Sequence, residues 1–251
     1  MSTSPLVSLA IAVAPLVAVG CGGGATGAPT TAGPATPVEA APDPAHHGHH
    51  GHHGADMPHR FEDADAWAKV FDDPARDAWQ RPDEVVALLA LAPGMVVADV
   101  GAGTGYFEGR IAAAVGPDGE VIATDVEPDM VRYLGERAAH DGWTNVRALQ
   151  VEPGDPGLAP ASVDRVLIVD VWHHLDDRAG YAARLATALR PGGWVAVVDF
   201  TGDAERGPPR DHRLAPEAII ADLTAGGLVA ELATETLPDQ YVVIGRLPDG
   251  R

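Results

Sequence analysis

Three glycines alternate with other residues after a short apolar segment, a pattern typical of a ligand-binding loop. Gly101, Gly103 and Gly105 follow the apolar residues 96–98. Glycine lets the backbone bend sharply and approach a ligand without interference from a Cβ atom. A dinucleotide-binding loop has the spacing G-x-G-x-x-G, and Tyr106 stands where its third glycine would fall. The spacing therefore argues against a pyrophosphate at the start of the following helix.

Acidic residues mark the ends of two apolar segments near this loop. Asp99 lies just before the glycines, and Asp125 ends the next apolar segment along the chain. In adenosine-binding sheets, a carboxylate at this second position accepts hydrogen bonds from the ribose hydroxyls and repels a 2′-phosphate. Asp125 therefore predicts a ligand that contains adenosine and lacks a 2′-phosphate.

A further group of polar residues follows another apolar segment. Asp170 is closely followed by His173 and His174. A histidine beside an acid can take the proton of a hydroxyl or thiol, or can instead orient a ligand or a loop. We expect one of the two histidines to be structural. Asp199 and His212, further along the chain, are weaker candidates for the same site.

A histidine-rich tract occupies residues 46–53. Imidazole nitrogens on a flexible chain can converge on Zn, Cu or Ni. No carboxylate or cysteine is spaced to fix a coordination geometry, so a defined metal centre is not expected. Weak metal binding and a solvated low-complexity tract both remain open. The candidate ligands are His46, His47, His49, His50, His52 and His53.

The N-terminus has the pattern of an export signal. Residues 6–19 are almost wholly apolar and too few to span a bilayer comfortably, as in the core of a signal peptide. The small residues before Cys21 resemble the lipobox of bacterial lipoproteins, although residues 1–8 carry no basic side chain. The resemblance implies lipidation of Cys21 and a membrane-anchored protein of the cell envelope. The alternative is an uncleaved N-terminus on a cytoplasmic protein.

Composition divides the chain into three parts. Residues 1–20 are the signal segment. Residues 21–57 have little to bury besides the histidine tract, and we predict a disordered tether. Residues 58–251 are long enough for one folded domain with a sizeable core. Its first helices are expected either to form a lid over the ligand site or to pack as core.

Within the folded part, apolar strand-like segments alternate with helical ones, which predicts an open, doubly wound α/β sheet with parallel strands. A ligand would then bind beyond the carboxyl ends of the strands. The expected strands are 96–100, 121–124, 146–151, 163–169 and 194–200, followed by an antiparallel pair at 228–234 and 240–247. The expected helices are 64–71, 82–91, 107–115, 127–140, 178–189 and 214–225.

These residues together resemble the class I S-adenosylmethionine-dependent methyltransferases. The resemblance is carried by residues 97–105, Asp125, residues 162–170 and residues 189–194, and it covers about residues 80–251. It implies a Rossmann-like sheet of seven strands, mostly parallel with the last strand antiparallel. It also implies S-adenosyl-L-methionine as the cofactor.

The resemblance also implies roles for individual residues. The backbone of the glycine loop would approach the methionyl part and the adenosine, with Asp99 near the amino group. Asp125 would bind the ribose. Asp155, with Glu152 as a rival, would bind the adenine, and Asp170 would face the methyl-transfer site. The predicted cofactor-binding residues are Asp99, Gly101, Ala102, Gly103, Gly105, Asp125, Val126, Asp155 and Asp170; the predicted catalytic residues are His173, His174 and Asp170.

Composition narrows the methyl acceptor. The chain has 17 Lys+Arg against 36 Asp+Glu and a formal net charge of −19, so it lacks a basic face for nucleic acid. We therefore expect a small-molecule acceptor, methylated by an in-line displacement that depends mainly on alignment. One alternative is an envelope metal-binding lipoprotein whose domain binds a ligand without turnover. A nucleotide-dependent oxidoreductase is disfavoured by Tyr106, and the oligomeric state stays open.

Overall fold

The computed structural model describes Phe61 and residues 63–248. The predicted signal segment with Cys21, the tether and the histidine tract of residues 46–53 lie outside the described residues. The predicted start of the domain at residue 58 lies outside them as well. Within the described part of the chain, no helix is both long and apolar enough to cross a membrane.

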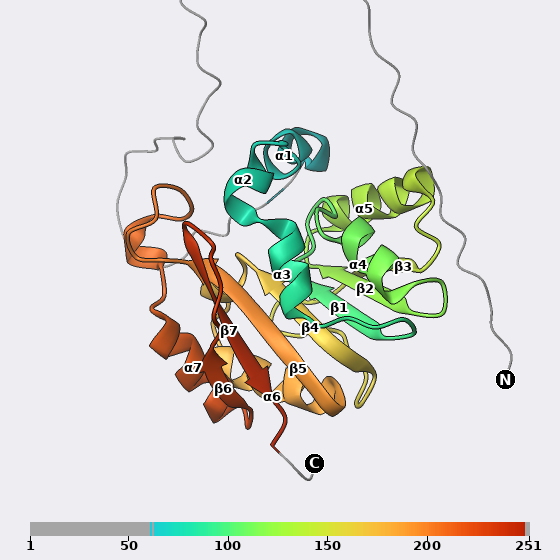
Figure 1. Cartoon of the computed structure of the whole chain (residues 1–251). Helices are drawn as coiled ribbons and strands as arrows, with labels where there is room; N and C mark the ends of the chain where they lie inside the picture. Colours follow the sequence, from blue (N-terminus) through green and yellow to red (C-terminus); the bar gives the residue numbers. More distant parts are fainter. Residues whose placement is uncertain (1–60, 62, 249–251) are drawn as a thin grey trace, which may run out of the picture. The chain divides into compact units, whose positions relative to one another are not determined.

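Seven strands form one sheet in the order β3-β2-β1-β4-β5-β7-β6 (Figure 1). Strands β1 to β5 are parallel, and β7 runs antiparallel to both β5 and β6. The predicted Rossmann-like sheet, with an antiparallel pair at its end, is therefore confirmed. The strands are β1 Val96–Val100, β2 Glu120–Asp125, β3 Val146–Gln150, β4 Val163–Val169, β5 Leu189–Phe200, β6 Val229–Leu232 and β7 Gln240–Arg246.

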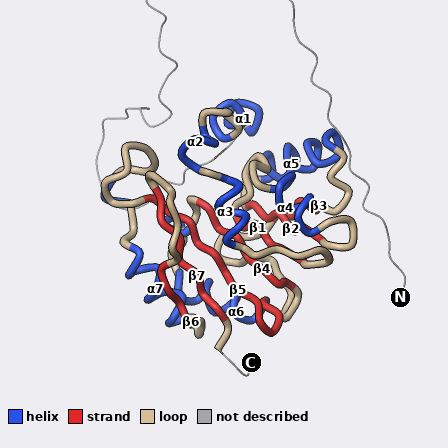
Figure 2. Tube along the Cα trace, in the orientation of Figure 1, coloured by secondary structure: helices blue, strands red, loops and turns tan. Residues whose placement is uncertain are grey.

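Helices cover both faces of the sheet (Figure 2). Three of them, α3, α5 and α7, have proline in the first turn, where its fixed φ suits the helix and no N–H is needed. The α-helices are α1 Ala64–Phe71, α2 Arg76–Gln80, α3 Pro82–Leu88, α4 Glu108–Val115, α5 Pro128–Asp141, α6 Arg178–Ala188 and α7 Pro216–Ala225. Two short 3₁₀ helices are η1 Trp172–His174 and η2 Arg210–His212.

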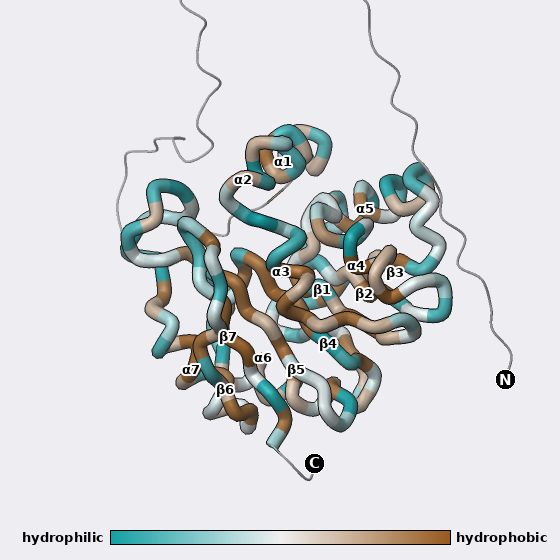
Figure 3. The backbone as a smooth tube through the Cα atoms, in the orientation of Figure 1, coloured by the Kyte–Doolittle hydropathy of each residue, from teal (hydrophilic) through white to brown (hydrophobic). Residues whose placement is uncertain are grey.

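The core has two halves, one on each face of the sheet, because successive strand residues point to opposite sides. In β1, Val97 belongs to the same cluster as Ile111 of α4. Its neighbour Ala98 and also Val100 belong to the cluster that contains Leu185 of α6. Figure 3 shows hydrophobic residues concentrated along the central strands. A strand buried on both faces is continuously apolar, which explains why residues 96–98 lack the polar alternation of a surface strand.

The strand order reverses between β1 and β4, which are neighbours in the sheet. The last residue of β1, Val100, is paired with Thr124 of β2 and with Ile168 of β4. The three strands therefore end close to the same level. The glycine loop, Asp125 and Asp170 follow at that level, which is the position where open α/β sheets bind their ligands.

Several predicted boundaries differ from the structure. The turn predicted at residues 191–193 is part of β5, which begins at Leu189, and the pairing of β4 with β5 shifts register between Val163 and Arg165. The helix predicted over 82–91 ends at Leu88. The helix predicted over 214–225 begins at Pro216, because a residue that precedes proline favours an extended backbone.

Candidate active site

The glycine loop connects β1 to α4 through backbone conformations that favour glycine. Gly101 has φ 71° and Gly103 has φ 56°. A Cβ atom on Gly101 would lie 2.4 Å from a methyl carbon of Val171, so no larger residue fits there without movement. The backbone N–H groups of Gly101 and Ala102 donate to the carbonyl of Thr124 at 2.8 and 3.0 Å. The loop is therefore held against the end of β2.

Asp125, the last residue of β2, holds the same loop with its side chain. One carboxylate oxygen accepts a hydrogen bond from the N–H of Gly103 at 2.9 Å, and the other accepts one from the N–H of Glu127 at 2.9 Å. Burial raises the pKa of Asp125. A carboxylate has about four acceptor positions, so further hydrogen bonds to a ligand remain available. The next residue, Val126, is 44% exposed and offers an apolar surface beside the carboxylate.

Asp99 forms a buried carboxyl pair with Glu108 of α4. Asp99 is 3% exposed and Glu108 is fully buried. Neither carboxyl oxygen of Glu108 has a hydrogen-bond partner within the described part of the chain. Burial and the nearby charge of Asp99 raise the pKa of Glu108 well above its usual range. Burial raises the pKa of Asp99 to about 7, although the neighbouring Glu108 carboxyl and the charge of Arg76 lower it.

Glu108 was not among the residues predicted from the sequence. An acid in the first turn of a helix has an ordinary explanation in the helix dipole, so its sequence position gave no signal of a buried partner.

Asp170 follows β4 in a left-handed conformation with φ 60°, which aspartate tolerates better than most residues. Burial raises the pKa of Asp170 to about 7, although the positive charge of Arg76 lowers it. One carboxylate oxygen of Asp170 accepts a hydrogen bond of 2.6 Å from the side-chain amide of Gln240 in β7. Asp170 is therefore fixed by a strand from the other end of the sequence.

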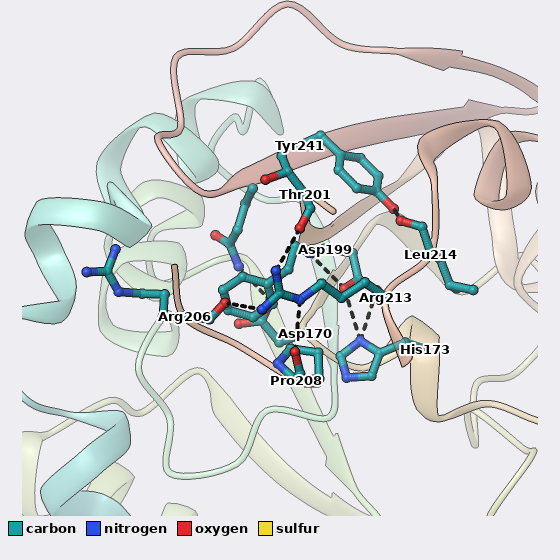
Figure 4. Close-up of polar contacts among 11 residues, drawn as sticks. Asp170, His173, Asp199, Thr201, Arg206, Pro208, Arg213, Leu214 and Tyr241 are labelled. Atoms are coloured by element: carbon teal, nitrogen blue, oxygen red, sulfur yellow. Dashed lines mark hydrogen bonds and ion pairs between the residues drawn. The ribbon is translucent and has the colours of Figure 1, made fainter. Parts of the chain in front are cut away.

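The two predicted histidines have different environments. His173 is 3% exposed at its side chain, and its Nδ1 lies 3.0 and 3.1 Å from the two carboxylate oxygens of Asp199 (Figure 4). Asp199 is fully buried at the end of β5 and orients the imidazole. His174 is exposed, with its ring 4.2 Å from that of His173 and 6.5 Å from that of Phe61. The structure therefore gives His173 an orienting carboxylate.

A chain of side chains joins α2 to the end of β4. The guanidinium of Arg76 donates to the amide oxygen of Gln80 from Nη2 at 3.1 Å and from Nε at 3.3 Å. Gln80 donates to Gln240 at 2.5 Å, and Gln240 donates to Asp170. The sequence did not predict Arg76, Gln80 or Gln240 as site residues. Arg76 and Gln80 lie on one helix, but the bonds of Gln240 to Gln80 and to Asp170 join elements that become neighbours only in the fold.

Helices α1 and α2 also contact the glycine loop. The hydroxyl of Thr104 donates to Asp72 at 3.2 Å, and Arg137 of α5 donates to both Asp72 and the carbonyl of Thr104, at 2.8 and 2.9 Å. The ring of Phe71 lies 3.7 Å from the position that a Cβ atom on Gly103 would occupy. The N-terminal helices are therefore placed where a lid would lie, and a lid function stays a prediction.

The remaining candidates lie outside this group of contacts. Asp155 is exposed and accepts a hydrogen bond of 2.9 Å from the N–H of Gly157, within the turn after β3. Glu152 and His212 are exposed as well. An adenine contact by Asp155 or Glu152 stays a prediction. No group of three or more His, Cys, Asp or Glu residues within the described part of the chain could hold a metal ion.

Part of this chain is similar to known methyltransferases. Residues 98–195 match a family model described as a methyltransferase domain. The arsenite methyltransferase of Halobacterium salinarum is 32% identical over 146 residues, which cover 58% of this chain and 37% of that protein. The nocamycin O-methyltransferase of Saccharothrix syringae is 30% identical over 158 residues, which cover 63% of this chain and 55% of that protein. The chain thus spans about a third to a half of these relatives.

The similarity extends to a solved structure. The crystal structure of a SAM-dependent methyltransferase from Aquifex aeolicus has a TM-score of 0.69 and 26% sequence identity, and the match covers 74% of this chain and 99% of that one. The fold is the Rossmann-like fold of class I methyltransferases. The part of the chain that these comparisons cover is thus similar to methyltransferases, among them one that depends on S-adenosylmethionine.

Proposed function

We propose that this protein transfers the methyl group of S-adenosyl-L-methionine to a small-molecule acceptor at the carboxyl ends of β1, β2 and β4. The observation that carries the proposal is the attachment of Asp125 to Gly103 beside the point where the strand order reverses. The names of two relatives, an arsenite methyltransferase and a nocamycin O-methyltransferase, refer to small acceptors. They support the same class of acceptor here.

The residues present fit the proposed cofactor. Asp125 offers further acceptor positions for the ribose hydroxyls, and the exposed Val126 offers an apolar contact beside them. Asp99 and Glu108 place acidic oxygens near the loop for an amino group. The bound cofactor supplies an electrophilic methyl group on a sulfonium. The task of the chain is then to hold an acceptor in line with that methyl group and to exclude water.

A protic acceptor also needs a group that takes its proton. His173 is suited to this role because Asp199 holds its Nδ1, which leaves Nε2 as the nitrogen that can accept a proton. Asp170 is a second candidate, since its pKa of about 7 lets it exchange a proton near neutral pH. His174 completes the predicted catalytic group. We infer that His173 is the base for a hydroxyl or thiol acceptor.

The proposal is tested first by ligand binding. The thermal midpoint of the whole protein is measured alone and with S-adenosylmethionine, S-adenosylhomocysteine or NAD. A ligand at about a hundred times its dissociation constant stabilises the folded state by about 2.7 kcal/mol, or about 5–10 °C in a domain of this size. We expect this shift with both sulfur ligands and none with NAD. Asp125→Ala should abolish it, whereas Asp118→Ala, in an exposed turn, should keep it.

A shift with NAD alone, or with no ligand at all, would overturn the proposed cofactor. If the sulfur ligands bind, transfer of a labelled methyl group to a panel of phenols, thiols, amines and arsenite identifies the acceptor class. Binding without transfer to any member of a broad panel would favour the alternative of a ligand-binding protein without turnover.

We also propose that lipidation of Cys21 attaches the protein to the cell envelope and that the tract of residues 46–53 binds Zn, Cu or Ni weakly. Cell fractionation and the mass of the N-terminal peptide test the first statement. A soluble protein that retains Met1 would overturn it. Metal titration of the whole protein and of a variant lacking residues 46–53 tests the second statement. Equal metal affinities of the two proteins would show that the tract does not bind the metal.

A further inference from the structure

Arg76 is a partly buried cation at the candidate site that has no carboxylate partner among the described residues. Three arginines lie near the glycine loop. Arg137 pairs with Asp72 at 2.8 Å, and Arg110 pairs with Asp83 at 2.9 Å. Arg76, by contrast, donates only to the amide oxygen of Gln80 and to the backbone carbonyl of Phe71. Its charge is therefore not neutralised by a direct ion pair.

The position of Arg76 links the two parts of the site. Its guanidinium carbon lies 4.1 Å from the centre of the Tyr106 ring, directly after the glycine loop. The charges of Asp170, beyond β4, and of Asp99, at the end of β1, both act on it, although burial is the stronger effect and lowers the pKa of Arg76. The cation thus lies between the loop after β1 and the end of β4.

The guanidinium is held in one orientation and keeps donors free. It uses Nε and one N–H of Nη2 on Gln80, and one N–H of Nη1 on Phe71, at 2.9 Å. An arginine has five N–H donors, so one remains on each terminal nitrogen. Gln80 is itself fixed by Gln240. Two free N–H groups on adjacent nitrogens match the two oxygens of a carboxylate.

The charges nearby limit what this cation could bind. The carboxyl groups whose charges act on it are those of Asp170, Asp72 and Asp99. A free carboxylate would be repelled there unless a cation met it. The methionyl end of the proposed cofactor is a zwitterion and needs one group of each sign. Asp99 is the expected partner of its ammonium, and an opposite partner is required for its carboxylate.

We propose that Arg76 of α2 binds the α-carboxylate of the methionyl end of the cofactor, opposite Asp99. The inference rests on the proposed function and adds a residue outside the part of the chain that matches the methyltransferase model, residues 98–195. It also gives α2 a binding role, because the helix carries the cation to the ligand. Gln80 and Gln240 are then positioning residues that act through Arg76.

The test compares two ligands that differ only in the carboxylate. Dissociation constants of S-adenosylmethionine and of decarboxylated S-adenosylmethionine are measured by calorimetry for the whole protein, Arg76→Gln and Arg110→Gln. Arg110 is the matched control, because it lies over the same Tyr106 ring at 5.4 Å and is paired with acids instead. We expect Arg76→Gln to raise the dissociation constant of S-adenosylmethionine by about 10- to 100-fold. The dissociation constant of the decarboxylated ligand should rise by less than about threefold. Arg110→Gln should change neither.

Arg76→Lys guards against a folding defect in the first variant. It keeps the charge and loses the paired donors. It should therefore lower the affinity for the carboxylated ligand only, and by less than Arg76→Gln does. Equal weakening of both ligands, or no weakening of either, would overturn the inference while the proposed function stands. If the unaltered protein binds neither S-adenosylmethionine nor S-adenosylhomocysteine, the proposed function fails and this inference fails with it.

Discussion

The side-chain amide of Gln80 donates a hydrogen bond of 2.5 Å to the amide oxygen of Gln240, 160 residues further along the chain. Both side chains are almost completely buried. The bond fastens the N-terminal helix α2 to β7, and Gln240 passes the connection on to Asp170 at the end of β4. A helix that precedes the sheet in sequence is therefore tied to the start of β7 and to the end of β4.

Loss of this connection should destabilise the fold. Gln240→Ala leaves the amide of Gln80 and the carboxyl of Asp170 without their partner, and a buried unsatisfied polar group costs about 1–3 kcal/mol. We expect the free energy of unfolding, measured by urea denaturation, to fall by about 2 kcal/mol or more. Gln150→Ala is the control, since Gln150 is exposed and makes one long bond of 3.5 Å. Equal losses in the two variants would contradict the importance of the buried amides.

Gly101 should be intolerant of a side chain for two separable reasons. Its φ of 71° is unfavourable for alanine, and a Cβ atom would lie 2.4 Å from Val171. Gly94 has a similar φ of 84° with nothing within 4 Å of its Cβ position. Gly94→Ala should therefore cost only the conformational penalty, about 1–2 kcal/mol, and Gly101→Ala distinctly more.

Thermal or urea unfolding of both variants measures this difference. Combining Gly101→Ala with Val171→Ala should recover part of the extra loss, because the second change removes the clashing methyl groups. If the double variant loses as much stability as the two single variants together, steric contact with Val171 is not the cause.

The buried carboxyl of Asp170 should make stability fall as pH rises. Its pKa is about 7 in the folded state, against about 4 in an unfolded chain, so the folded state binds the proton more tightly. This contribution to stability is fully present below about pH 4 and is lost as pH rises to about 7. Asp170→Asn removes the titration, keeps an acceptor oxygen for Gln240 and suits the left-handed backbone.

Between pH 5 and pH 8 the unaltered protein should therefore lose about 2 kcal/mol more stability than Asp170→Asn. Urea denaturation at both pH values measures the difference. Asp99 titrates in the same range but is present in both proteins, so its effect cancels. Asp155→Asn is the control, because Asp155 is exposed, and it should lose as much stability between the two pH values as the unaltered protein does. Parallel pH dependence of Asp170→Asn and the unaltered protein would refute this prediction.

The two neighbouring histidines should differ in their effect on turnover. With an acceptor that carries a hydroxyl or thiol, His173→Gln should lower kcat by about 100-fold, in the range typical for loss of a general base. Asp199→Asn should also lower kcat, because the imidazole loses the carboxylate that orients it. His174→Gln should change kcat by less than about threefold, since His174 is exposed.

Steady-state rates at saturating cofactor test this order, and the affinity for S-adenosylhomocysteine serves as a check that the cofactor site is intact. A large loss of kcat in His174→Gln with little change in His173→Gln would reverse the assignment.

Arg213 should hold the loop that follows β5. Its guanidinium donates to five backbone carbonyls, those of Thr201, Gly202, Ala204, Arg206 and Pro208, over 2.8–3.3 Å. Figure 4 shows Arg213 beside Thr201, Arg206 and Pro208. Arg213→Met leaves these oxygens to water and should open residues 201–209 to limited proteolysis. Arg147→Met is the control, because it removes an exposed ion pair with Glu120 and should change proteolysis little. Unchanged cleavage in Arg213→Met would show that residues 201–209 keep their conformation without the Arg213 side chain.

Much of the fold follows from local patterns in the sequence. Continuous apolar segments such as 96–98 and 166–169 indicate strands buried on both faces, and prolines mark the starts of α3 and α5. The glycine loop directly follows β1, and Asp99 and Asp125 lie at the ends of β1 and β2, so all three are recognisable from the sequence. Their proximity then requires only that parallel strands end at one edge of the sheet.

The tertiary structure alone decided which of these residues act together. Asp199 and His173 meet because β4 and β5 are neighbours. Gln80 of α2 meets Gln240 only because α2 packs near the start of β7. Glu108 pairs with Asp99 only when α4 returns over β1. Local patterns determine strands, turns and helix ends, since these depend on residues a few positions apart. Pairings between distant side chains depend on strand order and helix packing, which the whole core sets at once.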